Sequence, residues 1–229
     1  MVTTRPQQTE PSSPSILMRG VSWPTYKALL ADVGGDRAWR IAYDRGSLEL
    51  RMPLEEHEEP KGLLESFIEA IADELGIEVR KLGSLTLERE DLARAVEPDS
   101  CFYIQHEAQV RGRKIHLPDD PPPDLVIESD YTHSSVNKQS IYAALGVPEL
   151  WRYTNQTLLV YSRIEGGYEP CDTSLAFPIL PIAAVGDFIE QSRSIGQRAA
   201  VRLFRQRIHH LIHQDAYSKN EDGTSSPIA

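Results

Sequence analysis

PPPDLVIESDYTHSSVNKQSIYAALGVPELWRY, residues 121–153, is the stretch that decides the expected fold. The apolar run at 125–127 is typical of a buried strand. Ser134 or Ser135 can cap a helix, and Gly146 can end it, because serine suits a helix start and glycine a helix end. Strand character resumes immediately after this helix. The stretch therefore predicts a strand, a helix and a second strand.

Acids stand at both ends of the first strand, Asp124 before it and Glu128 after it. A buried charge without a partner is costly, so such groups normally have a cation, a hydrogen-bond donor or water beside them. We expect Asp124, which follows three prolines at the opposite end of the short strand from Glu128, to be a turn residue. A second strand candidate follows Asp99. If the two strands are neighbours, Asp99 and Glu128 converge at one edge of the sheet.

This pair of acids suits a metal site. Both carry acceptor-only carboxylates, which a hard cation such as Mg²⁺ (or Mn²⁺) prefers, and Lys138 at the start of the predicted helix adds a positive group. A metal held by Asp99 and Glu128 would polarise a phosphate and lower the pKa of its bound water. The competing interpretation is that all three residues are solvated ends of secondary structure.

Composition favours a single globular domain over residues 16–214 of the 229, with flexible tails at 1–15 and 215–229. No apolar run approaches a membrane span, and the first fifteen residues lack the continuous apolar stretch of a secretory signal, so we expect a cytoplasmic protein. Cys101 and Cys171 fit reduced thiols better than a disulfide.

The formal net charge of −10 argues against a protein that coats nucleic acid nonspecifically. Any nucleic-acid contact must therefore be local. Arg111, Arg113 and Lys114 form a basic cluster between the two acid-bearing strands that could touch a phosphate backbone, although a solvated loop explains them equally well. His57 could contact substrate from just before a predicted helix, and capping or simple exposure are its alternatives.

The pattern along the whole chain predicts a mixed α/β fold. Residues 38–53 alternate apolar and polar positions around a glycine-containing turn, which indicates a hairpin. Apolar residues recur at helical spacing over 58–75, and further helical patterns follow residue 181. The order is hairpin, helix, strands, helix, strands and helices, and it predicts a mixed sheet with helices packed on it.

These motifs together resemble the Uma-two family of restriction endonuclease-like proteins, in the PD-(D/E)XK nuclease superfamily. The resemblance covers roughly residues 48–153. It depends on MPLEEHE at 52–58, on Glu97-Pro98-Asp99, and on PDLVIE followed by Lys138, Tyr142 and GVPELW at 146–151. The combination is specific, whereas each piece alone is weak.

The resemblance implies a restriction endonuclease-like core with an N-terminal β-hairpin and C-terminal helices. It also implies that Asp99 and Glu128 are catalytic metal ligands and that the backbone carbonyl of Ser129 is a third ligand. Asp130 stands where the superfamily has its lysine, so Lys138 on the following helix resembles a migrated catalytic lysine.

The expected function is therefore a Mg²⁺-dependent endodeoxyribonuclease that hydrolyses DNA phosphodiester bonds, and a homodimer would allow it to cut both strands. The alternative is a noncatalytic nucleic-acid-binding or regulatory module that retains the fold, and Asp130 favours that alternative. A third and weaker candidate is a carboxylate-pair hydrolase such as a glycosidase.

Overall fold

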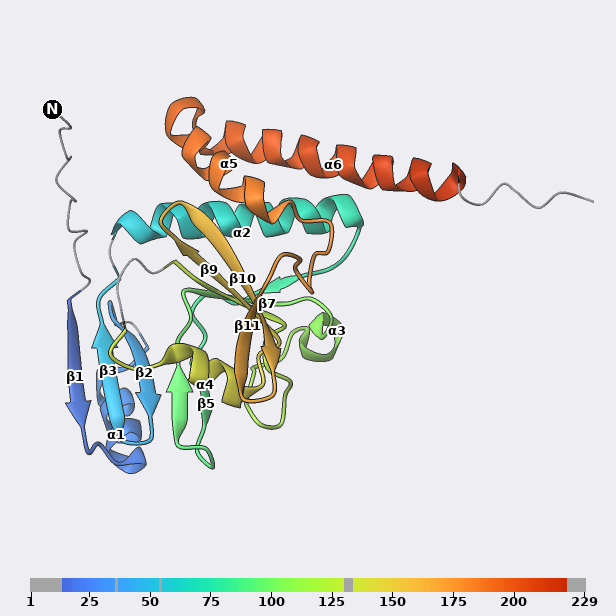
Figure 1. The fold of residues 1–229 in the computed structure, drawn as a ribbon. Helices are drawn as coiled ribbons and strands as arrows, with labels where there is room; N and C mark the ends of the chain where they lie inside the picture. Colours follow the sequence, from blue (N-terminus) through green and yellow to red (C-terminus); the bar gives the residue numbers. More distant parts are fainter. Residues whose placement is uncertain (1–13, 36, 54, 130–133, 222–229) are drawn as a thin grey trace, which may run out of the picture.

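The computed structural model describes residues 14–35, 37–53, 55–129 and 134–221. Figure 1 shows two sheets, with helices packed against them. The mixed α/β architecture predicted from the sequence is confirmed.

Within these residues, the large sheet has six strands in the order β11-β10-β9-β8-β7-β4. Strands β7, β8 and β9 are central, and β8 pairs antiparallel with β7 and parallel with β9. The bounds are Gly167–Cys171 (β11), Thr157–Ile164 (β10), Glu149–Thr154 (β9), Leu125–Glu128 (β8), Ser100–Tyr103 (β7) and Arg80–Lys81 (β4).

The small sheet, again as far as the structure describes the chain, has five antiparallel strands in the order β1-β3-β2-β6-β5. Its bounds are Ser15–Arg19 (β1), Arg40–Asp44 (β2), Ser47–Arg51 (β3), Leu87–Arg89 (β5) and Arg94–Val96 (β6). Strands β2 and β3 are the predicted hairpin.

Helices cover both faces of the large sheet. Figure 1 shows α2, α5 and α6 on one side of it and α4 on the other. The helices are α1 (Trp23–Val33), α2 (Glu55–Leu75), α3 (Glu107–Val110), α4 (Lys138–Leu145), α5 (Ile182–Ile195) and α6 (Gln197–Glu221).

The alternation of side chains along β8 connects these two layers. Leu125 and Ile127 belong to the core beneath α2, α5 and α6, whereas Val126 packs in the core that includes α4. Every second residue of a strand faces the same side, so Glu128 points to the α4 side with Val126. This alternation places the second predicted acid beside the helix that carries Lys138.

Several boundaries differ from those predicted. Helix α2 begins at Glu55 and contains Pro60, so His57 lies within the helix instead of before it. Helix α4 begins at Lys138, because the side chain of Asn137, and not that of Ser134 or Ser135, accepts the N–H of Ser140 and caps the helix.

Other elements were not predicted at all or run further than predicted. The sequence patterns gave no indication of β1, which begins at the last residue of the expected tail, or of α1. Helix α6 continues to Glu221, beyond the expected domain end at 214. Cys101 and Cys171 are free thiols, as expected. In the described part of the chain, no helix is long and apolar enough to cross a membrane.

Candidate active site

The register of β7 and β8 brings the two predicted acids together. Ser100 pairs with Ile127, so the next position on each strand sets Asp99 opposite Glu128. Opposite residues of an antiparallel pair have Cβ atoms about 4.5–5.5 Å apart. Asp99 Oδ2 also accepts hydrogen bonds from the backbone N–H and the hydroxyl of Ser129, at 2.7 and 2.9 Å. The predicted convergence of the acids at one sheet edge is confirmed.

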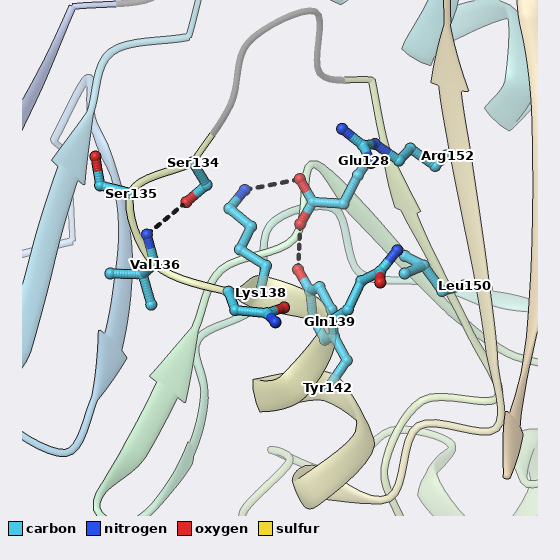
Figure 2. A pocket seen from close by; sticks show the side chains of 10 residues that line it. Glu128, Ser134, Ser135, Val136, Lys138, Gln139, Tyr142, Leu150 and Arg152 are labelled. Carbon is cyan, nitrogen blue, oxygen red and sulfur yellow. Dashed lines mark hydrogen bonds and ion pairs between the residues drawn. The ribbon is translucent and has the colours of Figure 1, made fainter. Parts of the chain in front are cut away.

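Glu128 is held by two side chains from α4. The Lys138 ammonium donates to Glu128 Oε2 at 2.7 Å, and the Tyr142 hydroxyl donates to Glu128 Oε1 (Figure 2). The two donors are four residues apart, so one face of the helix presents both. Glu128 and Lys138 are largely buried, with side-chain exposures of 7% and 14%. Lys138 thus reaches the site from the first turn of its helix, as predicted.

Burial dominates the electrostatics of this carboxylate. It raises the pKa of Glu128 from 4.5 to about 7, since a charge in the interior loses its hydration; Lys138 opposes the rise and the negative charge of Asp99 adds to it. Burial and the adjacent Glu128 also raise the pKa of Tyr142 well above its ordinary value. The hydroxyl of Tyr142 therefore stays protonated and remains a donor.

A cavity of about 340 Å³ opens beside these residues. Arg152 lies on its wall next to Glu128, because β8 and β9 are parallel with these two residues in register (Figure 2). The lining residues come from β8, from the segment before α4, from α4 and from β9: Glu128, Ser134, Ser135, Val136, Asn137, Lys138, Gln139, Tyr142, Leu150 and Arg152.

Glu49 of the small sheet fixes the segment that leads into α4. This buried carboxylate accepts the backbone N–H of Ser135 at 3.0 Å and the hydroxyl of Ser134, and Arg51 lies 3.5 Å from it. Sequence reasoning did not identify Glu49. In the sequence, Glu49 is one acid in the alternating pattern of a hairpin strand. That pattern indicates a buried functional acid only when both faces of the small sheet are known to be covered.

The opposite end of the same strand pair carries a different acid. Asp124 is buried, and its Oδ2 accepts the backbone N–H groups of Ile104 and His106 at 2.7 and 3.0 Å. Its Oδ1 pairs with the His106 ring. These contacts close the turn after β7, which agrees with the structural role predicted for Asp124.

The predicted basic cluster of Arg111, Arg113 and Lys114 is not brought to this site. The segment carrying Arg111, Arg113 and Lys114 leaves β7 at the end opposite Asp99 and Glu128. Arg111 pairs with Glu107, and Arg113 pairs with Asp120 at 2.8 Å. Local ion pairs at the far end of the strands explain the two arginines, so the geometry gives them no route to the acids.

The remaining candidates are less informative. The side chain of His57 and all of Asp130 lie outside the described residues. Within the described ranges, no three His, Cys, Asp or Glu side chains gather as a metal-ligand set. The donors available here are thus the two carboxylates and backbone oxygens such as that of Ser129.

Comparison with known proteins gives the family. No curated protein matches the sequence. One solved structure, described as "a putative nuclease belonging to DUF820" from Anabaena variabilis, is 17% identical and covers 70% of this chain and 90% of its own, with a TM-score of 0.44. A likeness this distant assigns no activity. The model of the Uma2 family, described as "Putative restriction endonuclease", matches residues 23–188, well over half of the chain and the entire site. The chain therefore belongs to the Uma2 family of restriction endonuclease-like proteins.

Proposed function

We propose that this protein is a magnesium-dependent endonuclease that hydrolyses phosphodiester bonds of DNA, with Asp99, Glu128 and Lys138 as its catalytic residues. The observation that carries the proposal is the buried Lys138–Glu128 pair, 2.7 Å apart, on the same face of the sheet as Asp99 and at the wall of a cavity. Membership of the Uma2 family supports the reaction class.

The donor set fits Mg²⁺ or Mn²⁺. Both acids offer hard oxygen ligands. Among the residues that the structure describes, none donates a hydrogen bond to Asp99 Oδ1, so this oxygen is available to a ligand. The raised pKa of Glu128 means that its anion is under-compensated by Lys138 and Tyr142 alone. We assign Asp99 and Glu128 as metal ligands and the Ser129 carbonyl as a third oxygen donor.

A bound divalent cation would supply Lewis-acid activation of the phosphate and of a water molecule. The residues of the chain have separate tasks around it. The Lys138 ammonium can orient the attacking water or offset negative charge that develops on the phosphate. The Tyr142 hydroxyl holds Glu128 Oε1, and Ser129 holds Asp99 Oδ2, so that both carboxylates keep one orientation.

Plasmid nicking tests this proposal. Wild-type protein should cut with Mg²⁺ or Mn²⁺ and should be inhibited by Ca²⁺, whose larger and looser coordination holds ligands without the geometry that the reaction needs. Glu128→Gln should abolish cutting, because it keeps the volume and removes the anion. Lys138→Ala should slow cutting by about 10²-fold, the effect of losing one positioned electrostatic or proton-transfer group.

The two variants also separate enzyme from contaminant. Equal nicking by wild type, Glu128→Gln and Lys138→Ala, purified identically, would place the activity elsewhere. Absence of nicking by wild type on supercoiled, linear and single-stranded DNA would favour the noncatalytic module.

A further inference from the structure

We propose that Arg152 binds the phosphate group of the substrate at the wall of the active-site cavity. This inference rests on the proposed function and adds a substrate-binding residue to it. The motifs that led to the acids and to Lys138 do not include Arg152, and it emerges only from the pairing of β8 with β9.

The strand register determines where Arg152 lies. It is the parallel partner of Glu128, and neighbouring strands run about 4.8 Å apart. Along β9, Leu150 and Arg152 line the cavity, whereas Trp151 and Tyr153 are part of the core on the other face. The arginine therefore shares the face of Glu128 and Lys138, and Figure 2 shows its side chain beside that of Glu128.

The guanidinium of Arg152 has no partner among the residues that the structure describes. In the part of the chain that the structure describes, no acid or carbonyl oxygen accepts a hydrogen bond from it, and both oxygens of Glu128 are already engaged by Lys138 and Tyr142. Other arginines of this acidic chain do pair with acids, such as Arg94 with Asp44 at 2.9 Å. Arg152 thus lines the cavity without an acceptor among the described side chains and carbonyls.

The chemistry of this side chain suits a phosphodiester. A guanidinium is planar, always charged, and donates in a fork that matches two phosphate oxygens. The substrate is an anion that must approach Asp99 and Glu128, and Lys138 is committed to Glu128. Arg152 supplies a second positive charge on the same face. It can therefore hold the phosphate against the repulsion of the two carboxylates.

The test compares Arg152→Ala and Arg152→Lys with Arg163→Ala. Arg163 is an exposed arginine on β10 of the same sheet, outside the cavity lining, so its removal changes the net charge equally. Binding of a fluorescent DNA duplex is measured in Ca²⁺ at several salt concentrations, so that cleavage does not enter. Thermal midpoints verify that each variant is folded.

Arg152→Ala should weaken binding about tenfold and reduce the slope of log K against log salt by about one, the loss of one phosphate contact. Arg152→Lys should retain the slope and recover part of the affinity, and Arg163→Ala should match wild type. In nicking assays Arg152→Ala should raise KM more than it lowers kcat.

Equal affinity and slope for Arg152→Ala and Arg163→Ala would overturn the assignment, as would wild-type protein that binds no duplex. Failure of the proposed function looks different, since Glu128→Gln would then cut like wild type. If Glu128→Gln is inactive while Arg152→Ala binds and cuts normally, the nuclease proposal stands and the role of Arg152 does not.

Discussion

The two ends of the β7–β8 strand pair each bury a carboxylate in a different way. At one end, Asp124 accepts two backbone N–H groups and pairs with His106. At the other end, among the described residues, Glu128 accepts hydrogen bonds from the side chains of Lys138 and Tyr142, beside a cavity and a second acid. The same six-residue motif, DLVIES, therefore supplies both acids.

The difference teaches how a structural acid is distinguished from a candidate catalytic one. Backbone donors are fixed by the fold, and at Asp124 they bind the carboxylate while closing a turn. The environment of Glu128 leaves its charge only partly compensated, and burial raises its pKa to about 7. A buried carboxylate whose charge is only partly compensated destabilises the folded state, and a cation bound in the cavity would remove this cost.

The largest expected effect is the contrast in activity between Glu128→Gln and Asp124→Asn. Glu128→Gln should lower the nicking rate by about 10³-fold or more, at the upper end for loss of one electrostatic group. Asp124→Asn, corrected for the folded fraction, should cut at nearly the wild-type rate. Rates are measured under single-turnover conditions in Mg²⁺. Similar losses in both variants would remove the functional distinction between the two ends.

The pH dependence of stability should reveal Glu128 in metal-free protein. Its folded pKa of about 7 exceeds the unfolded value near 4.5, so the folded state binds an extra proton between these values. The contribution of Glu128 to the free energy of unfolding should therefore fall as pH rises from 4.5 to 7 and level off above 7, by about 3 kcal/mol in all.

Glu128→Gln lacks this titration, and the measurement is the difference between wild type and variant in urea unfolding with a chelator present, from pH 4.5 to 8. Wild type should lose stability relative to the variant as pH rises. A constant difference across this range would mean that Glu128 is ionised throughout.

Asp124→Asn should lower the free energy of unfolding by about 1–3 kcal/mol, because the amide oxygen can still accept the backbone N–H groups but an NH2 replaces the carboxylate oxygen that pairs with His106. Urea unfolding at pH 7 measures this loss. Glu128→Gln, measured in parallel, should lose less or gain stability, because it removes an under-compensated charge. The reverse ranking would make Glu128 the structural acid.

The smallest effect is expected for Glu49→Gln. This change keeps the volume of the buried side chain but weakens its bonds to Ser134 and Ser135, so the segment before Lys138 should be held less firmly. Nicking should fall about tenfold, the lower end of the loss expected when a residue that positions a site is replaced, and kcat should change more than KM. Arg163→Ala serves as an unaffected control. Unchanged kcat would show that the segment does not need this anchor.

Local hydrophobic periodicity was enough to predict the strand that carries Glu128 and the helix that carries Lys138. The motif resemblance, which covers both acid-bearing strands, predicted that Asp99 and Glu128 converge. Glu49 and Arg152 could not be predicted in the same way. Glu49 reaches the site from a separate sheet, and Arg152 becomes meaningful only when the parallel register with β8 is known. Both depend on tertiary contacts that no local pattern encodes.

The position of the basic cluster could not be predicted from the sequence either. Arg111, Arg113 and Lys114 lie between the two acid-bearing strands in the sequence, but an antiparallel pair sends its connection out at one end only. This connection leaves at the end away from Asp99 and Glu128, so residues that lie between the two acids in the sequence lie far from them in the structure. Strand direction, which the sequence patterns did not reveal, decided their position.

The most direct test of the central claim is a crystal soaked in Mn²⁺ and measured for anomalous scattering. Asp99 and Glu128 should share one Mn²⁺ peak, with carboxylate oxygens at about 2.0–2.3 Å, in the range of hard-cation distances, and Glu128→Gln should lose it. No peak should appear at Asp124. Absence of Mn²⁺ between Asp99 and Glu128 at saturating concentration, or an equal peak in Glu128→Gln, would contradict the assignment of this end of the strand pair as the metal-dependent active site.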